Sequence, residues 1–305
     1  MDNNEIKQLI TQFSHSKPDT IGIFGYGSGV NKQAGYTNKD RPQIDLIMVV
    51  NNTEKWHLEN IKINPDNYSL TSKLFFSKID SKWQHFATDI CYLPYIKELG
   101  HTFKIGIISK DDLLNDLYNW ESFYLAGRFQ KIILPIKSTA ELDVAISKNR
   151  EKAITIALLL MRKKELNLYN LFKKICSLSY LGDIRMGIAE NPKKLDNLVK
   201  GGYEEFKKIY SNSNLFQIDS NEKIIINHDS LYSSMEQLPK SLITHLETNN
   251  YSLEQLITLR KLLIDFFTEK NKHVSRDQAI KGFFTAGPVN SISYLTEKIL
   301  KKIKK

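Results

Sequence analysis

The chain is predicted to combine a mixed α/β domain with a mostly helical part. Two short apolar segments, residues 20–24 and 43–50, flank a glycine-rich turn and predict two strands. Beyond Pro135 the apolar residues recur at helical spacing. A content of 41% apolar and 25% charged residues is ordinary for a globular protein, and 305 residues suffice for one large or two ordinary domains.

In the first part, helices and strands are expected to alternate. Thr53 is expected to cap one helix. Ser109 is expected to cap another, with Asp111 and Asp112 in its first turn. The expected helices are 5–14, 53–60 and 110–120, and the expected strands are 20–24, 43–50, 73–79, 90–93 and 103–109.

A boundary is expected near Pro135, where polar residues 137–139 follow. Beyond it, segments 215–218 and 223–227 flank a polar turn and predict a β-hairpin, which among helices is typical of a winged-helix-like domain. We therefore expect an α/β domain over residues 1–135, a helical winged-helix-like domain over 136–275, and a C-terminal turn with an amphipathic helix over 276–305. The expected helices are 140–164, 168–178, 192–199, 203–210 and 253–267, and a polar linker is expected over 268–276.

Composition limits the cellular setting and the partners. The net charge of +9 suggests a polyanionic partner, although a solvated Lys-rich surface explains it equally well. The two cysteines, Cys91 and Cys176, stand far apart in apolar segments and predict buried thiols. The start of the chain is acidic, with no signal or Arg-rich transit segment, and no apolar run is long enough to span a bilayer. These features predict a cytoplasmic protein, peripheral on the inner face of the cell membrane.

The glycine turn is the first candidate site. Gly27, Ser28 and Gly29 follow the first expected strand, and Asp45 stands near the start of the second. Glycines let backbone N–H groups approach phosphate oxygens, and a strand carboxylate can hold Mg²⁺ together with substrate phosphates. The turn lacks the Gly-Lys-Ser/Thr of a Walker-A loop and the spacing of a dinucleotide fingerprint. A Gly-Ser turn and an acid at a strand start are also common without function.

The ordered set of motifs resembles the mitochondrial-type phosphatidate cytidylyltransferases, the translocator assembly and maintenance family. The Gly-Ser turn followed by an acid is itself the pattern of the polymerase-β-like nucleotidyltransferase fold. The matching segments run in the same order to near the C-terminus. They are Tyr26–Val30, Asp45 before an apolar strand, Glu54–His57 with Asn60 and Asn64, Tyr68-Ser69, Gly106–Ser109, Asp112–Leu114 with Asp116-Leu117 and Trp120, Tyr124–Lys131, Leu178–Met186, and Lys281-Gly282 with Thr285–Val289.

The resemblance implies a fold and a reaction. Members of that family make CDP-diacylglycerol and pyrophosphate from CTP and phosphatidic acid with Mg²⁺, in phospholipid biosynthesis. It implies a nucleotidyltransferase domain followed by a winged-helix-like domain.

The resemblance also suggests site residues. Asp45 is the expected Mg²⁺ ligand and a catalytic residue, and Gly27, Ser28, Gly29 and Arg128 are expected to bind the nucleotide. The other expected catalytic residues are Lys131, Asp183, Arg185 and Lys281. Lys131 and Arg128 are also consistent with an ordinary surface pair, and Asp183 with Arg185 is also consistent with an internal ion pair.

One position departs from the expected pattern. Related folds carry a second acid two residues after the first, where this chain has Ile47. Another acid is therefore expected to complete the site, and Asp89, Asp111, Asp112 and Asp183 are the candidates. His57 is expected to be a packing or capping histidine, because a phosphomonoester is already anionic near neutral pH and needs no strong base.

The segment from Ser291 to Lys305 is the expected membrane contact. Its apolar residues recur at helical spacing, and five lysines crowd its end: Lys298, Lys301, Lys302, Lys304 and Lys305. A basic amphipathic helix of this kind can lie on an anionic lipid surface. A helix docked on the protein body explains the same pattern.

Two other functions fit parts of the sequence. A nucleic-acid-binding or -modifying nucleotidyltransferase would use the positive charge and the winged helix. The lysines gather at the C-terminus while the expected wing is mixed in charge, so no nucleic-acid partner is expected. A catalytically inactive scaffold would explain Ile47, but the Gly-Ser turn and Asp45 argue against it.

Overall fold

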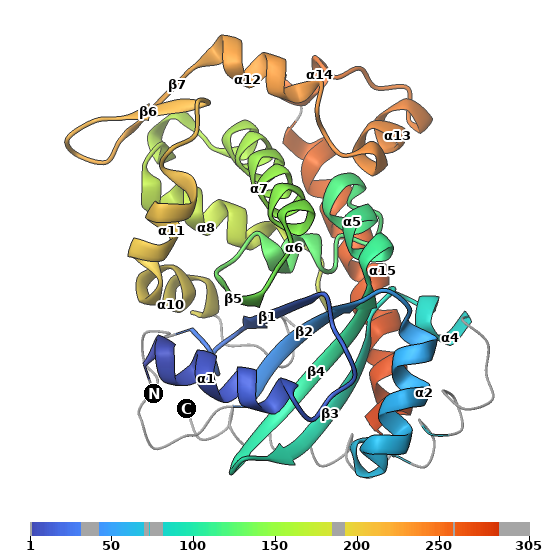
Figure 1. Cartoon of the computed structure of the whole chain (residues 1–305). Helices are drawn as coiled ribbons and strands as arrows, with labels where there is room; N and C mark the ends of the chain where they lie inside the picture. Colours follow the sequence, from blue (N-terminus) through green and yellow to red (C-terminus); the bar gives the residue numbers. More distant parts are fainter. Residues whose placement is uncertain are drawn as a thin grey trace.

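The computed structural model describes residues 2–31, 43–69, 73, 82–184, 193–258 and 260–286. Its central element is a five-stranded mixed sheet in the order β3-β4-β2-β1-β5, in which only the β2–β4 pair is parallel. Figure 1 shows this sheet beside a mostly helical part, with α15 (Arg260–Ala286) running from that part to the sheet. The expected mixed α/β class is confirmed.

The sheet strands are β1 (Gly22–Tyr26), β2 (Ile44–Val50), β3 (Cys91–Glu98), β4 (His101–Ser109) and β5 (Ile133–Lys137). The elements around the sheet are α1 (Asn3–Ser14), α2 (Thr53–Ile63), η1 (Pro65–Asn67), α4 (Lys82–His85), α5 (Lys110–Asn119) and α6 (Ala126–Phe129). The helical part contains α7 (Ala140–Leu160), η2 (Lys163–Glu165), α8 (Leu168–Leu178), α10 (Lys194–Gly201), α11 (Tyr203–Tyr210), the hairpin β6 (Phe216–Ile218) and β7 (Ile224–Ile226), α12 (His228–Met235), α13 (Lys240–Thr248) and α14 (Gln255–Thr258).

Helices cover both faces of the sheet, and its inner strands are buried on both sides: all of β1 and all of β2 except Asp45 are buried. Successive side chains of β2 point to opposite faces. Leu46 and Met48 pack with residues of α1 and α2, whereas Ile47 and Val49 pack with residues of α5, α6 and α7. Asp45 lies two residues before Ile47 on β2, so both side chains point to the same face of the sheet, the one covered by α5, α6 and α7.

Most of the expected elements are confirmed. The predicted hairpin forms as β6 and β7, and Ser109 caps α5 by accepting a hydrogen bond from the Asp112 amide. Cys91 and Cys176 are both buried, as expected. In the described residues, no helix has the length and apolarity needed to cross a bilayer.

Two local expectations are wrong, the cap of α2 and the linker over 268–276. Asn52, and not Thr53, caps α2, because the Asn52 side chain accepts the amide hydrogen of Lys55. Pro135 itself lies inside β5, an edge strand that tolerates a residue without an N–H, and β5 ends at Lys137, shortly before α7 begins at Ala140. The expected linker over 268–276 is part of α15, so the expected boundary between residues 275 and 276 falls inside a helix. The expected strand 73–79 lies outside the described residues except for Lys73.

α15 joins the helical part to the sheet domain. The Asn271 side-chain amide donates to the carbonyls of Leu178 and Leu181 at 2.8 Å. About three turns further along α15, the buried Lys281 ammonium donates to the Gln84 and Thr88 carbonyls at 2.6 and 2.7 Å. These contacts fix the segment before β3 and the loop after α8 on one helix.

Gly182 shows how closely that loop is packed, and it gives a first prediction. Its φ is +74°, and a Cβ there would lie 2.2 Å from the Thr268 carbonyl oxygen. Gly100 has nearly the same φ of +72° but nothing within 4 Å of its Cβ position. We expect Gly182→Ala to lower the free energy of unfolding by several kcal/mol, and Gly100→Ala by only the ~1 kcal/mol of left-handed strain. Urea unfolding of both variants measures the difference, and equal losses would contradict the close packing at Thr268.

His57 on α2 gives a second prediction. Its ring is 1% exposed, and Nδ1 lies 2.9 Å from the Tyr68 hydroxyl. Burial, helped by the Lys281 charge, lowers the pKa of His57 from 6.5 to about 3. The folded protein therefore keeps a neutral ring while the unfolded chain takes up a proton below pH 6.5. This contribution to stability is complete above pH 6.5 and is lost as the pH falls towards 3.

We expect wild-type protein to lose about 2 kcal/mol more than His57→Gln when the pH is lowered from about 7.5 to 5, since each pH unit below 6.5 costs about 1.4 kcal/mol. Urea unfolding at the two pH values measures this. Replacement of the exposed His273 by Gln is the matched control. Parallel pH profiles for wild type and His57→Gln would show that the ring is not held neutral.

Candidate active site

The glycine turn follows β1 in a geometry that only small residues allow. Gly27 has a φ of +76°, and its carbonyl accepts the amide hydrogens of Val30 and Asn31. A Cβ at Gly29 would lie 2.1 Å from the Gln43 carbonyl oxygen, so this glycine has no room for a side chain. The turn is therefore pressed against the start of β2.

Asp45 lies directly beside this turn. A Cβ at Gly27 would be 3.1 Å from Asp45 Oδ2, so the carboxylate faces the Gly27 backbone. In the sheet, Asp45 pairs with Tyr26 on β1 and with Lys104 on β4. The expected neighbourhood of Gly27, Ser28, Gly29 and Asp45 is thus present.

Two cations lie on the same face of the sheet. The Arg128 guanidinium carbon is 4.7 Å from the centre of the Tyr26 ring and 4.8 Å from that of Tyr124, and Lys104 Nζ is 4.2 Å from the centre of the Tyr92 ring. Arg128 is carried by α6, which packs over β1 through Phe129. The site therefore combines one carboxylate with two cations stacked on tyrosine rings.

Both cations stay charged in spite of their burial. Burial by itself lowers the pKa of Lys104, but Tyr26 and Asp45 outweigh it and the net pKa is raised. Burial likewise opposes the charge of Arg128, while the neighbouring tyrosines and Asp45 raise its pKa. Burial raises the pKa of Tyr26, so its hydroxyl stays protonated and can donate a hydrogen bond.

Several polar atoms of this group are buried and lack hydrogen-bond partners among the other described residues. Within the described part of the chain, Arg128 Nε has no hydrogen-bond partner, and the hydroxyls of Tyr26 and Tyr92 have none except each other. A buried polar group without a partner costs about 1–3 kcal/mol, so such atoms in one place indicate a site prepared for a polar ligand. Buried cations and hydroxyl donors favour an anion with several oxygen atoms, such as a phosphate chain.

The side chains at this site can also be tested for a metal. Mg²⁺ in nucleotide sites is held by one or two carboxylates together with substrate phosphates and water. Asp45 offers carboxylate oxygens next to the backbone of the glycine turn, which suits one ligand of such an ion. The donor set therefore fits Mg²⁺ bound jointly with a triphosphate.

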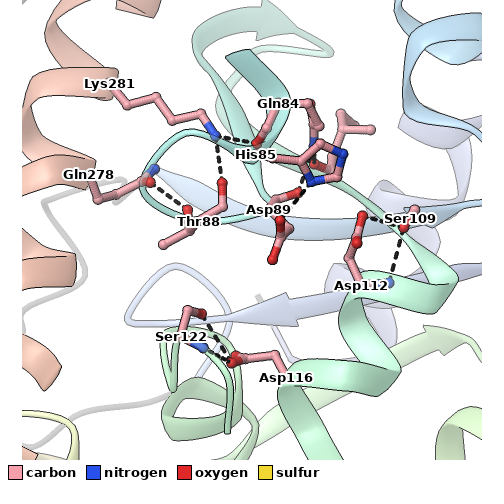
Figure 2. Close-up of polar contacts among 11 residues, drawn as sticks. Gln84, His85, Thr88, Asp89, Ser109, Asp112, Asp116, Ser122, Gln278 and Lys281 are labelled. Carbon is pink, nitrogen blue, oxygen red and sulfur yellow. Dashed lines mark hydrogen bonds and ion pairs between the residues drawn. The ribbon is translucent and has the colours of Figure 1, made fainter. Parts of the chain in front are cut away.

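A different group of side chains could also hold a metal. In the described part of the chain, one set of three such residues has its ligand atoms within 4.8 Å of one another: His85, Asp89 and Asp112. His85 Nδ1 is 2.7 Å from Asp89 Oδ1, and the Ser109 hydroxyl donates to Asp112 (Figure 2). Two of the expected acids thus meet each other, at the opposite end of the sheet strands from Asp45.

The remaining predicted residues lie in three other places: Lys131 just after α6, Asp183 in the loop after α8, and Lys281 on α15. Lys131 Nζ donates to the Gly127 carbonyl at 2.9 Å and lies over the Tyr180 ring, and Asp183 is buried in the loop after α8. Lys281 binds the backbone before β3, as Figure 2 shows. Arg185 and the segment from Ser291 to Lys305 lie outside the described residues.

Sequence reasoning missed Lys104 and Tyr92 as site residues. Lys104 is the one charged residue in the apolar run 103–108, which was the available signal. Tyr92 has its place because Gly106 leaves room for it: a Cβ at Gly106 would lie 2.6 Å from the Tyr92 ring. Tyr26 and Tyr124 lie inside two of the motifs that carry the family resemblance, but their side chains were not predicted to belong to the site.

Known proteins resemble this chain over nearly its whole length. A protein named mitochondrial phosphatidate cytidylyltransferase from Schizosaccharomyces pombe is 33% identical, covering 97% of this chain and 84% of the relative. Proteins of the same name from Saccharomyces cerevisiae and Rattus norvegicus are 34% and 30% identical, covering 98% and 94% of this chain and 71% and 92% of the relatives.

These relatives correct the expected location. The acidic start of the chain predicted a cytoplasmic protein on the inner face of the cell membrane. All three relatives are named as mitochondrial, which points to mitochondria instead. An address segment is read by receptors separately from the fold, so the composition of the folded part does not carry it.

A solved nucleotidyltransferase-like protein from Exiguobacterium sibiricum also matches, over 91% of this chain and 77% of that one, at 11% identity. Its TM-score of 0.25 is too low to support an argument.

The family model for mitochondrial phosphatidate cytidylyltransferase matches residues 6–301, which include the glycine turn, Asp45, Lys104 and Arg128. The chain belongs to the mitochondrial phosphatidate cytidylyltransferase family.

Proposed function

We propose that this chain is a CTP:phosphatidate cytidylyltransferase, a nucleotidyltransferase that makes CDP-diacylglycerol and pyrophosphate, and that the Asp45 face of the sheet is its active site. Family membership supports the reaction. The observation that supports the site is the meeting of Asp45, the Gly27–Gly29 turn, Lys104 and Arg128 on one face.

The reaction is an in-line substitution at phosphorus. An oxygen of the phosphatidate phosphate forms a bond to the α-phosphorus of CTP, while the bond from that phosphorus to the bridging oxygen breaks and pyrophosphate leaves. The attacking phosphate is largely ionised near pH 7, because its second pKa is about 6. No residue has to remove a proton, so catalysis consists of positioning and charge stabilisation.

Each residue at the site has a place in this proposal. The N–H groups of the Gly27–Gly29 turn hold triphosphate oxygens, and Ser28 adds a hydroxyl. Arg128 and Lys104 oppose the negative charge that grows on the departing pyrophosphate, and the Tyr26 and Tyr92 hydroxyls donate to phosphate oxygens. Asp45 holds Mg²⁺, which when bound neutralises charge on the phosphate oxygens.

Residues further from Asp45 have supporting roles in the proposal. The two carbonyl contacts of Lys281 favour holding the start of β3 over touching substrate. Lys131 and Asp183 lie around the loop that follows α8, and we assign them to positioning this loop. Arg185 remains a predicted catalytic residue. The winged-helix-like description of residues 136–275 likewise remains a proposal.

The substrate also requires contact with a lipid surface. Phosphatidate resides in a bilayer, and the basic segment from Ser291 to Lys305 is the proposed contact. Each lysine near an anionic surface contributes about 1 kcal/mol, an effect that salt screens.

The activity is tested by following pyrophosphate release and CDP-diacylglycerol formation. We expect both products only when CTP, Mg²⁺ and phosphatidate are all present, and we expect chelation of Mg²⁺ to stop the reaction. With phosphatidate in vesicles, raising salt from about 0.1 to 0.5 M should lower the rate, whereas soluble short-chain phosphatidate should be much less sensitive. No product from either form of phosphatidate would refute the proposed reaction, and equal salt sensitivity would refute the basic contact.

Asp45→Asn tests the metal assignment. The amide keeps the shape but loses the negative charge, so we expect kcat to fall at least 100-fold and the Mg²⁺ concentration for half-maximal rate to rise. Asp219→Asn in the β6–β7 turn is the matched control, because it makes the same change at a carboxylate that accepts two hydrogen bonds in the helical part. Asp112→Asn examines the His85 group in the same assay. A shift in Mg²⁺ dependence for Asp112→Asn with none for Asp45→Asn would move the metal to that group.

A further inference from the structure

We infer that Asp116 is a positioning residue for the cytidylyl transfer, acting through Tyr124 and Arg128. The inference rests on the proposed function, because it assigns these two residues to the active site. Asp116 lies near the end of α5 and is 3% exposed. It contacts the segment that carries both site residues.

The Asp116 carboxylate accepts five hydrogen bonds from one short loop. Oδ1 accepts from the Ser122 amide at 2.8 Å, the Ser122 hydroxyl at 3.0 Å and the Phe123 amide at 2.7 Å. Oδ2 accepts from the Leu125 and Ala126 amides, both at 2.9 Å. Figure 2 shows the Ser122 contacts from the end of α5. One buried carboxylate thus determines the course of the chain from residue 122 to 126.

This loop and the helix after it need an external partner. α6 spans only Ala126–Phe129. The side chain of its N-cap residue, Leu125, makes no hydrogen bond to the first amides of the helix. A helix this short is not stable by itself, and its first N–H groups require acceptors from elsewhere. Asp116 supplies that acceptor, and its negative charge at a helix start is favourable.

The loop backbone is also strained. Trp120 and Phe123 have φ values of +52° and +60°, a region that side chains with a Cβ rarely adopt. Such conformations persist only where the surroundings hold them, and they gather at functional sites. The Phe123 amide is one of the Asp116 donors, so the carboxylate directly holds one of these two residues.

Asn149 of α7 holds the same segment through three further hydrogen bonds. Its side-chain amide donates to the Ala126 carbonyl at 2.9 Å, and its oxygen accepts from Trp120 Nε1 at 2.8 Å and from Gln130 Nε2 at 3.1 Å. The segment between Trp120 and Gln130 is therefore clamped by two buried side chains. Within this clamp stand Tyr124 and Arg128, whose ring and guanidinium lie 4.8 Å apart.

The clamp requires a carboxylate at position 116. All five groups that reach it are donors, and the two oxygens of a carboxylate only accept. An asparagine has nearly the same shape but would turn an NH₂ group towards at least two of these donors. Asp116→Asn therefore disturbs the loop without opening a cavity. A displacement of about 1 Å in a positioning group can cost about 100-fold in rate.

The experiment is a double-mutant cycle on kcat with CTP and phosphatidate. We expect Asp116→Asn to lower kcat about 100-fold with a small change in KM, and Arg128→Ala to lower it 100- to 1000-fold. Because Asp116 acts through Arg128 and its neighbour Tyr124, the double variant should be only slightly slower than Arg128→Ala alone. Asp219→Asn, the same change at another loop-holding carboxylate, should leave kcat unchanged.

Two further measurements make the test complete. Ser122→Ala removes one donor to Asp116 and a contact to the Tyr124 amide, so it should give a smaller loss of kcat with the same non-additivity, even if Asp116→Asn folds poorly. Hydrogen exchange should show faster exchange of the 122, 123, 125 and 126 amides in Asp116→Asn, with β2 amides unchanged.

Multiplicative losses in the cycle, or unchanged exchange at these amides, would overturn the positioning role. A wild-type protein that makes no CDP-diacylglycerol would overturn the proposed function instead. The exchange measurement would still decide whether Asp116 holds the loop.

Discussion

The register of three neighbouring strands is the constraint on which the site depends. Tyr26, Asp45 and Lys104 lie opposite one another on β1, β2 and β4. Because a strand alternates its faces with period two, a slip of one residue between β2 and β4 would place Asp45 and Lys104 on different faces. A slip between β1 and β2 would separate Tyr26 from Asp45 in the same way. The apolar alternation along β2 fixes this register, since Leu46 and Met48 must face α1 while Ile47 and Val49 face α5 and α7. The register that packs the apolar core is therefore the same register that places Lys104 beside Asp45.

The charges at this site balance one another only in part. One carboxylate, Asp45, lies near two cations, Lys104 and Arg128, and the tyrosine hydroxyls add donors and no charge at neutral pH. Burying cations is unfavourable unless they are compensated. The pKa values of both cations are nevertheless raised, so they remain charged, and among the described residues of the site they outnumber the one carboxylate. A nucleoside triphosphate with its metal is the type of ligand that balances such an environment, and this agrees with family membership.

Local patterns allowed much of the fold to be predicted, and long-range contacts explain the rest. The glycine turn beside Asp45 was accessible because a strand, a turn and a strand follow one another in sequence. Lys104 was missed because it joins Asp45 across a parallel pair, a relation that spacing does not reveal. Pro135 signals the approach to the helical part from sequence alone, but its place inside an edge strand depends on the sheet order, which local patterns do not give. The polar composition of residues 268–276 predicts a linker, but in the structure the segment is helical. One of its polar residues, Asn271, donates a hydrogen bond to the Leu178 carbonyl at the end of α8.

The same long-range contacts explain why the family motifs are scattered along the chain. The motif glycines allow close approaches between distant segments: a Cβ at Gly106 would meet Tyr92 and one at Gly127 would lie 2.6 Å from the Ser179 Cβ. The motif acid Asp116 and the motif lysine Lys281 instead bind backbone, one at the loop before α6 and the other before β3. All four residues can shape the site without touching substrate. A nucleotidyl transfer that needs no general base depends on geometry, so residues that fix the frame are under the same constraint as residues that touch the phosphates. Glycines that allow close packing, together with buried acids and lysines that bind backbone groups, are residue types that can fix this geometry.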